Sequence, residues 1–531
     1  MRLHILPERL RMNLPPHVSQ HWNIRKPAAR GEGGVVASQC RDAAEAGAEI
    51  LRAGGTAADA AVGAAFALAT VEPWNSGLGG IGFAQVMKPG GAAETLDFGP
   101  VAPRGLDPSA YPLTGRLKND LFSWPEVVGD VNIHGPKSAL IPSAIAGYAE
   151  LHRRHGRMPM RDIMAPAVAL ARRGLPADWF TTLKVANSAA VLRNYAESSR
   201  IYLPNGLPPI APYQGTPGFF QQGKLADTLE RLQLAGLADF YTGDVAASLV
   251  ADMAEMGGFV AAADLAGCAV VARPAMEVAF RGRRWMLANG LTAAPTLARL
   301  MALMEDAPYK AIPDAGWYAH LARAMRAAYA ERLAGLGDAE PAGADSCTTH
   351  LTVADRDGMM VAMTTTLLSS MGSRLVLPRT GVLMNNGVMW FDPTPGSANA
   401  IAPGRRPLCN MCPVIVLDAK GMPEFAGGAS GGRRILAAVF QMLSYVTDFA
   451  MEAEAASHHP RLDVSGPEGV TADHRLGEAV FAALAADAPV EVVEHAVLPV
   501  NFACPNLIQQ KAGMRVGVTD TMSPWSAAVA E

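Results

Sequence analysis

Hydrophobic and polar positions follow two different patterns in the two parts of this chain. In the first two thirds, long stretches with helical spacing alternate with breaks rich in Pro and Gly, such as Leu203-Pro204-Asn205-Gly206. The stretches that predict helices are 42–53, 56–71, 143–174, 224–256 and 315–335. Short apolar runs predict strands at 33–39 and 83–87. We therefore expect this part to be rich in helix around a few strands.

Beyond residue 348 the pattern changes to the alternation that is typical of strands. The runs that predict strands are 350–354, 359–367, 380–384 and 413–417, and one long helix is predicted at 433–447. Asp357-Gly358 supplies turn geometry between the first two runs, which predicts a hairpin with Ala354 opposite Met359. That register places Thr348 opposite Thr365 and beside Thr366. Together the elements predict a layered α/β fold with an antiparallel sheet and helices outside it.

Composition narrows the classes of protein that fit. The chain has 531 residues, of which 50% are hydrophobic and 18% charged, as expected for a large globular protein of two or more domains or one large sandwich. The net charge is −4 and no basic cluster contains interleaved aromatic residues, so nucleic acid is not an expected partner. No apolar run approaches the roughly 20 residues of a membrane span, and no apolar signal segment is visible. We expect no membrane partner and a cytoplasmic location.

Candidate chemistry is concentrated in the tract from Cys347 to Asp355, CTTHLTVAD, where a strand-like run opens on two hydroxyl residues. If the bond between Cys347 and Thr348 is cut, Thr348 carries both a hydroxyl nucleophile and a free α-amine. An α-amine with a pKa of roughly 7.7–8.0 can accept the proton of the hydroxyl without a histidine. Threonine is also common in strands, so the tract by itself is equally consistent with ordinary sheet.

Two further features support a catalytic interpretation. The second hydroxyl expected beside Thr348 can orient it, although a pair of Thr residues across strands also stabilises ordinary sheets. The glycine-rich segment 427–432 leads into the predicted helix at 433–447. Backbone N–H groups at the start of a helix can face a developing oxyanion, and the alternative is a glycine turn that caps the helix. Cys409 and Cys412 have CxxC spacing, but without a second pair a metal or redox site is disfavoured.

These features resemble the γ-glutamyltransferase family of N-terminal nucleophile hydrolases. The matching segments occur in the family's order and extend over nearly the whole chain from Gly33 onward. They are Leu51 to Ala61 (LRAGGTAADAA), Ser76 to Gly80 (SGLGG), Thr348-Thr349-His350, Asn385-Asn386, Arg406-Pro407-Leu408 with Met411 and Pro413, and Gly428 to Gly432.

The resemblance implies an αββα sandwich and a precursor that cleaves itself between Cys347 and Thr348. Residues 1–32 would form an extension, 33–347 the large subunit and 348–531 the small subunit, and the two fragments would remain associated. Thr348 would attack the carbonyl of a small-molecule amide, and Thr366 matches the family's second threonine. Gly431 and Gly432 would hold the oxyanion, and the acyl-enzyme ester would pass to water or an amine. The resemblance implies no metal and no organic cofactor.

The chain differs from the family at the residues that bind a γ-glutamyl group. Gly99 follows Asp97-Phe98, where the family has a carboxylate-binding Arg. Leu368 replaces an Asn two residues beyond the second threonine, and Trp390 replaces an acidic residue after Asn385-Asn386. Each lost charge-assisted hydrogen bond is worth about 1.5–3 kcal/mol, so an acyl group other than plain γ-glutamyl is expected. The predicted substrate pocket consists of Gly99, Leu368, Asn386, Trp390, Cys409 and Asn410, with Cys409-Asn410 standing where the family has Ser-Ser.

Three hypotheses follow from the sequence. The first is a self-processing amide hydrolase or acyltransferase with a neutral or hydrophobic acyl group. The second is a true γ-glutamyltransferase or glutathione hydrolase, for which Arg104 or Arg374 would anchor the carboxylate instead. The third is an unprocessed, non-catalytic relative that acts as a binding protein.

Overall fold

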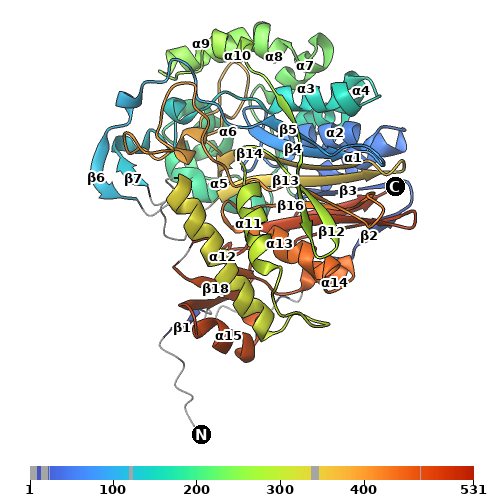
Figure 1. Ribbon diagram of the computed structural model, residues 1–531. Coiled ribbons are helices and arrows are strands. Elements are labelled where there is room, and N and C mark those ends of the chain that lie inside the picture. The colour runs from blue at the N-terminus through green and yellow to red at the C-terminus, as the bar shows by residue number, and fades with distance from the viewer. Residues whose placement is uncertain (1–8, 14–21, 23, 119–123, 337–345, 467) are drawn as a thin grey trace.

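Two seven-stranded sheets lie face to face at the centre of the protein (Figure 1). The computed structural model describes residues 9–13, 22, 24–118, 124–336, 346–466 and 468–531. The first sheet has the strand order β10-β5-β4-β14-β13-β3-β22. Its strands are Val271–Pro274, Glu94–Phe98, Ile81–Met87, Met360–Ser369, Ser346–Asp355, Gly34–Ser38 and Ala527–Ala530. All neighbouring strands in it are antiparallel.

The second sheet has the order β11-β12-β15-β16-β20-β21-β2 and is also antiparallel throughout. Its strands are Met276–Phe280, Arg283–Leu287, Val414–Leu417, Pro423–Ser430, Cys504–Lys511, Met514–Thr519 and Ala29–Gly31. Small and aliphatic side chains fill the space between the two sheets. These include Val35, Ala354, Met360, Ile415 and Ile508, which are all completely buried.

Helices cover the outer face of each sheet. The first sheet packs against α1 (Arg41–Arg52), α2 (Ala57–Val71), α3 (Ala144–His155) and α4 (Met160–Arg173). The second packs against α11 (Ala294–Met304), α12 (Ala315–Leu336) and α13 (Arg434–Thr447). The order is therefore helix, sheet, sheet, helix, and it confirms the predicted αββα sandwich.

Local sequence accounts for the start of helix α2. Thr56 caps α2 because its hydroxyl accepts the N–H of Asp59, whose carboxylate in turn accepts the N–H of Thr56. Every residue of α2 is buried, since the helix lies between the sheet and its neighbours α1 and α4. The expected helices at 42–53, 56–71, 315–335 and 433–447 are all confirmed within about one or two residues. The stretches 143–174 and 224–256 are each divided, the second into α7 (Leu225–Ala235), α8 (Asp239–Thr242) and α9 (Asp244–Glu255).

The hairpin of β13 and β14 forms, but its predicted register is wrong by one residue. Ala354 pairs with Met360 rather than Met359, because the turn between Asp355 and Met359 contains three residues and ends on Gly358 with a φ of 85°. A shift of one residue exchanges the two faces of a strand, so Thr349 and not Thr348 lies opposite Thr365.

The expected strand at 380–384 is also wrong. The chain turns at Gly381, whose φ is 68°, and makes only the isolated bridges Val376 to Leu383 and Gly79 to Met384. The glycine-rich segment 427–432 divides between two structures. Gly427 and Gly428 lie within β16, and only Gly431 and Gly432 form the turn into α13.

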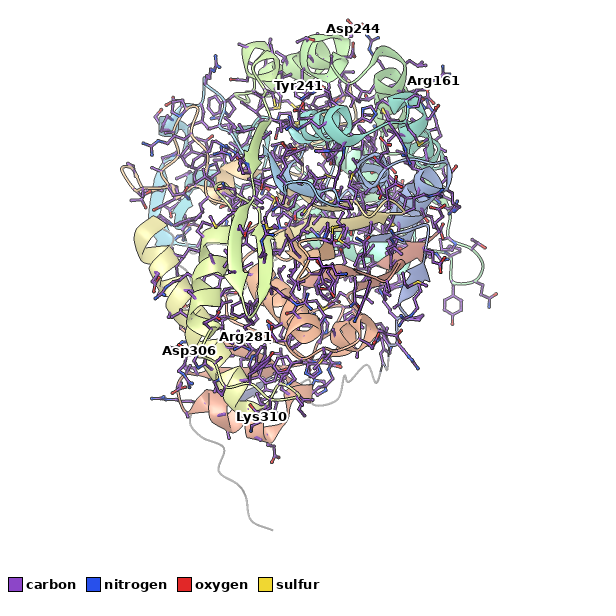
Figure 2. All side chains as sticks on the ribbon, turned by 45° about the vertical axis from the view of Figure 1, so that its right-hand side comes forward. Arg161, Tyr241, Asp244, Arg281, Asp306 and Lys310 are labelled. Carbon is purple, nitrogen blue, oxygen red and sulfur yellow. The ribbon has the colours of Figure 1, made fainter. Side chains whose placement is uncertain are left out.

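The described parts of the expected extension 1–32 are joined to the rest of the fold. β1 (Leu10–Asn13) adds a parallel strand to β19 (Val490–Val493) in a small sheet with β18 (Val470–Asp473) and β17 (Leu462–Asp463). Side chains fill the layers on both sides, with Tyr241 in the helical layer outside the first sheet and Arg281 beside the second (Figure 2). Among the described residues, no helix combines the length and apolar character that a membrane crossing requires.

Candidate active site

Thr348 lies at an irregularity near the start of β13. The ladder between β13 and β14 shifts between Cys347 and Thr349, so Thr348 occupies a bulge. Its Oγ1 lies 3.2 Å from Oγ1 of Thr366, and both side chains are buried. The N–H of Leu368 donates to Thr366 Oγ1 at 2.8 Å and holds that oxygen in place. The bulge therefore brings together the two hydroxyl groups that the sequence predicts.

The peptide bond between Cys347 and Thr348 is intact in this structure, and Cys347 pairs through its backbone with Leu368. The side chain of Cys347 lies outside the part of the chain that the structure describes. Thr348 nitrogen is a peptide N–H in the uncut chain and becomes an amine only after cleavage. His350 is completely buried between Thr364 and Thr352, and burial lowers the pKa of its imidazole to about 3. Both ring nitrogens of His350 are engaged by the hydroxyl groups of Thr364 and Thr352, so His350 does not serve as a base for Thr348.

Gly431 and Gly432 occupy the turn between β16 and α13, with φ values of 137° and 59°. A Cβ at Gly431 would lie 2.8 Å from the backbone of Ala503, so the turn has no room for a side chain there. Within the described part of the chain, no hydrogen bond occupies the N–H of either glycine. Gly431 lines the same cavity as Thr348. These N–H groups suit the oxyanion role that the sequence predicts.

A line of hydrogen bonds connects the residue after Thr348 with the residue before Gly431. Thr349 Oγ1 donates to Glu72 at 2.8 Å, and Asn75 Nδ2 donates to the other oxygen of Glu72 at 2.7 Å. Asn75 also donates to Gln39 at 3.4 Å, and Gln39 donates to the hydroxyl of Ser430. Burial raises the pKa of Glu72 to about 7, and the bonds from Thr349 and Asn75 together with the charge of Lys184 limit that rise.

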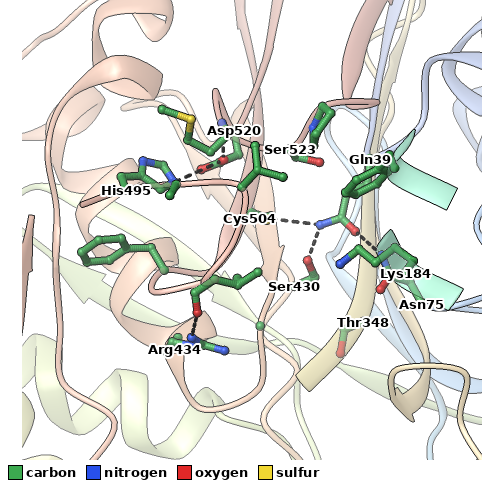
Figure 3. A pocket seen from close by; sticks show the side chains of 18 of the residues that line it. Gln39, Asn75, Lys184, Thr348, Ser430, Arg434, His495, Cys504, Asp520 and Ser523 are labelled. Atoms are coloured by element: carbon green, nitrogen blue, oxygen red, sulfur yellow. Dashed lines mark hydrogen bonds and ion pairs between the residues drawn. The ribbon is translucent and has the colours of Figure 1, made fainter. Parts of the chain in front are cut away.

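Thr348 opens into a cavity of about 60 Å³ between the end of β16 and the loops around residue 500. Figure 3 shows its lining from close by. The charged and titratable side chains that line it are Glu72, Lys184, Arg434, His495, Cys504 and Asp520. Phe180, Val497 and Phe502 contribute apolar surface. The nucleophile predicted from the sequence therefore faces a cavity lined by both charged and apolar side chains.

The residues predicted for the substrate pocket lie elsewhere around the site. Leu368, Trp390 and Cys409 pack in one buried apolar cluster, together with Phe83 and Trp124. None of the three lines the cavity that contains Thr348. The cluster approaches the nucleophile through Leu368, whose N–H holds Thr366.

Gly99 stands beside this cluster. A Cβ at Gly99 would lie 2.5 Å from the ring of Phe83 and 3.0 Å from the guanidinium of Arg406. Arg406 pairs with the completely buried Asp97, which also accepts the N–H of Gly99 at 3.0 Å. The ion pair and the ring occupy the space that an arginine at position 99 would need.

Asn386 and Asn410 are held by the protein itself. Asn386 Nδ2 donates to Ile133 O and to Ser369 Oγ, both at 2.7 Å. Asn410 Oδ1 accepts Arg332 Nη2 at 3.1 Å. Neither lines the cavity at Thr348. Their role in binding substrate stays a prediction.

The alternative carboxylate anchors do not line the cavity either. Arg104 is exposed, and the guanidinium of Arg374 donates to Ser369 Oγ and Gly372 O, both at 2.7 Å. Sequence reasoning instead missed Glu72 and Lys184, which do line it. Glu72 sits in the tract Val71-Glu72-Pro73 directly after a helix made almost entirely of apolar residues, a signal that could have marked it as a buried acid. Lys184 has no comparable signal in the sequence.

Comparison with known proteins adds independent findings. The profile of the family described as Gamma-glutamyltranspeptidase matches residues 43–346 and 339–529. A glutathione hydrolase proenzyme of Pseudomonas aeruginosa is 31% identical over 487 residues, which cover 81% of this chain and 82% of that protein. An acylase ACY 1 proenzyme of Pseudomonas sp. strain SE83 is 30% identical over 518 residues, 90% of each chain.

Solved structures show the same fold. The crystal structure of a cephalosporin acylase from Bacillus halodurans superposes with a TM-score of 0.82 at 22% identity, covering 97% of this chain and 98% of that one. The likeness in fold therefore extends over nearly the whole chain. Because the family profile covers nearly all of the chain and close relatives match most of its length, this chain belongs to the gamma-glutamyltranspeptidase family.

Proposed function

We propose that this chain is a self-processing amide hydrolase or acyltransferase whose nucleophile is Thr348. The observation that carries the proposal is the pair of hydroxyl groups of Thr348 and Thr366, 3.2 Å apart. Thr348 shares its cavity with Gly431 of the glycine turn, whose N–H groups have no hydrogen-bond acceptor among the described residues. Relatives named as proenzymes, which include a glutathione hydrolase and an acylase, support the same conclusion.

The first step is cleavage of the chain by its own nucleophile. Thr348 Oγ1 adds to the carbonyl carbon of Cys347, and the peptide C–N bond breaks as the nitrogen takes a proton. The resulting ester is hydrolysed by water, which leaves a carboxylate on Cys347 and an amine on Thr348. The fragments 1–347 and 348–531 are the proposed subunits.

In the mature protein, Thr348 acts on an external amide. The amine of Thr348 takes the hydroxyl proton as Oγ1 attacks the amide carbon, and it returns a proton to the departing amine. Gly431 and Gly432 stabilise the oxyanion, and Thr366 orients Oγ1. The ester then transfers its acyl group to water, which regenerates the hydroxyl, or to a second amine.

The acyl group is proposed to differ from plain γ-glutamyl. Gly99, Leu368 and Trp390 offer neither the guanidinium nor the carboxylate that would bind a free α-carboxylate and α-ammonium, and Leu368 and Trp390 pack in an apolar cluster. A glutathione hydrolase is the second candidate, because a relative of that name is 31% identical. Release of nitroaniline from γ-glutamyl-p-nitroanilide, with and without an acceptor dipeptide, separates the two. Strong release would favour the second candidate.

Intact-mass analysis tests the proposed nucleophile. The purified chain is expected to give two fragments that meet at Cys347/Thr348, and Thr348→Ala a single uncut chain. Thr348→Ser is the matched control, because it keeps the hydroxyl and should still cleave. An uncut wild-type chain would contradict the proposal and favour a non-catalytic binding protein.

A further inference from the structure

A short crossover joins the two central sheets near the end of the chain. It comprises residues 520–526, DTMSPWS, which lead from β21 in the second sheet to β22 in the first. The cavity that contains Thr348 is lined by four of its residues: Asp520, Met522, Ser523 and Pro524. Figure 3 shows Asp520 and Ser523 at the border of that cavity. The position of the crossover therefore sets the shape of one wall beside the proposed nucleophile.

The two ends of the crossover are anchored by the rest of the fold. The N–H of Asp520 donates to the backbone oxygen of Pro505 at 2.9 Å. Near the other end, the backbone oxygen of Trp525 accepts the N–H of Arg41 at 2.7 Å, and the indole ring packs against Trp74 with centroids 5.2 Å apart. The stretch between these two anchors carries most of the cavity wall.

Lys26 holds this stretch from the N-terminal side of the chain. Its Nζ donates to the backbone oxygen of Ser523, to the backbone oxygen of Ser526 at 3.0 Å and to the hydroxyl of Ser526 at 2.6 Å. An ammonium group has three donors, so these bonds use all of them. One side chain thus fixes Ser523 and Ser526 relative to each other.

The ammonium group of Lys26 is drawn out of water to make these bonds. Lys26 is half-buried, and burial lowers the pKa of its ammonium group to about 8, while the charge of Asp520 limits that fall. A surface lysine normally keeps its charged end in water, and a charge taken from water needs hydrogen bonds in exchange. The contact is therefore specific in a way that a flexible lysine on the surface is not.

The segment that carries Lys26 is itself fixed. The backbone N–H of Lys26 donates to His458 Nε2 at 3.1 Å, and the N–H of Ala28 donates to Glu454 at 3.0 Å. Both acceptors belong to α14 (Ala453–His458). The chain then continues as β2, the strand that pairs with β21 directly before the crossover. Lys26 therefore connects the crossover to a helix and a strand of the second layer.

We propose that Lys26 is a positioning residue that fixes the crossover, and with it one wall of the cavity at Thr348. The inference rests on the proposed function, because the wall affects the reaction only if amides reach Thr348 through this cavity. After the proposed cleavage, Lys26 belongs to the fragment 1–347 and the crossover to the fragment 348–531. The contact thus joins the two fragments beside the nucleophile, and the segment 24–31 is a working part of the protein rather than a dispensable extension.

Hydrogen exchange tests the contact without any catalysis. In the uncut Thr348→Ala chain at pH 7, where Lys26 carries its proton, Lys26→Met should speed amide exchange in the crossover roughly 10- to 100-fold, because bonds to a charged group are lost. Ser526→Ala removes one acceptor and should cause a smaller rise in the same segment. Arg25→Met is the matched control, since Arg25 lies on the same segment, is exposed and pairs with Glu454 instead.

Two results of this measurement would overturn the proposal. One is unchanged exchange in the crossover of both Lys26→Met and Ser526→Ala. The other is a rise that spreads evenly over the whole chain in both variants, which would mean that the contact contributes only to overall stability.

Kinetics of the cleaved protein test the consequence for the reaction. Lys26→Met should raise KM for the best amide substrate roughly 10-fold and leave kcat within about threefold, because the wall moves while the nucleophile and the glycine turn keep their places. Lys26→Arg keeps the charge and should recover most of the affinity, and Arg25→Met should behave as wild type. An unchanged KM in Lys26→Met, or an equal loss in Lys26→Arg, would contradict the positioning role. A wild-type chain without activity refutes the proposed function instead, and the exchange measurement still decides whether Lys26 fixes the crossover.

Discussion

At the scale of single residues, the proposed mechanism depends on the hydroxyl groups of two side chains, Thr348 and Thr366. A hydroxyl beside the nucleophile can direct its lone pairs toward a substrate carbonyl. Thr366 is itself positioned by the N–H of Leu368 at 2.8 Å, so its oxygen has little freedom. In the proposed mechanism Thr366 positions the hydroxyl and Thr348 attacks.

Removal of the second hydroxyl should therefore impair catalysis more than folding. Thr366→Val keeps the shape of the side chain and should lower kcat roughly 10- to 100-fold. Thr366→Ser keeps the hydroxyl and should retain most of the activity. The measurement is kcat on the best amide substrate, with Tm recorded for each variant. Wild-type kcat in the Val variant would show that Thr366 has no positioning role.

Glu72 gives the protein a pH dependence of stability with a definite sign. Burial raises the pKa of its carboxyl from the ordinary 4.5 to about 7, so between these values the folded chain holds a proton that the unfolded chain releases. The free energy of unfolding therefore falls as pH rises through this range.

Glu72→Gln should remove this contribution. In the uncut Thr348→Ala background, Tm of the Gln variant should decline less than that of its parent between about pH 5 and about pH 8. Thermal melting at several pH values measures the difference, and Glu331→Gln serves as an exposed control. Parallel curves for Glu72→Gln and its parent would show that Glu72 does not titrate in this range.

At the scale of elements, two backbone irregularities build the site. The bulge in β13 turns Thr348 toward Thr366, and the glycine turn between β16 and α13 presents two N–H groups beside it. Both lie at the end of a regular strand that fixes their position. The regular strands of the sandwich thus hold the site rigidly, and the bulge and the glycine turn present its proposed functional groups.

Gly431→Ala should prevent the turn from stabilising the oxyanion. The new Cβ would meet Ala503 at 2.8 Å while the φ of 137° disfavours any side chain. Activity is expected to fall about 100-fold or more, as for loss of an oxyanion donor. Gly105→Ala is the control, because nothing lies within 4 Å of its Cβ. Activity within a few-fold of wild type in the Gly431 variant would contradict the oxyanion role.

At the scale of the whole molecule, the proposed cleavage cuts a chain whose two fragments are interleaved. In the first sheet, β13 and β14 of the later fragment lie between β4 and β3 of the earlier one. In the second sheet, β12 of the earlier fragment pairs with β15 of the later one, and β2 pairs with β21. Separating the fragments would break backbone ladders in both sheets and expose the core between them.

The cleaved protein should therefore behave as one particle. Native size-exclusion chromatography is expected to give one peak that contains both fragments, with the same elution volume as uncut Thr348→Ala. Chromatography in concentrated guanidinium chloride should separate them. Separation under native conditions would contradict the interleaved arrangement.

The sequence by itself determined much of this protein. Periodicity predicted the main helices, because an apolar face or an all-apolar run depends only on local spacing. The Thr-Thr-His tract and the glycine pair marked a candidate nucleophile and oxyanion site, and the order of the motifs identified the family and its αββα layers. The proposed nucleophile Thr348, Thr366 and the glycine turn are close together in the structure.

Only the tertiary structure decided the remaining details. The register of β13 and β14 depends on a three-residue turn and a bulge, and alternation of side chains cannot distinguish registers that differ by such small backbone features. Glu72 and Lys184 reach Thr348 from helices far away in the chain, and no local pattern encodes which distant side chains converge. The cavity and its charges follow only from the packing of the layers, because packing brings Glu72 and Lys184 to one cavity and buries Glu72, which raises the pKa of its carboxyl.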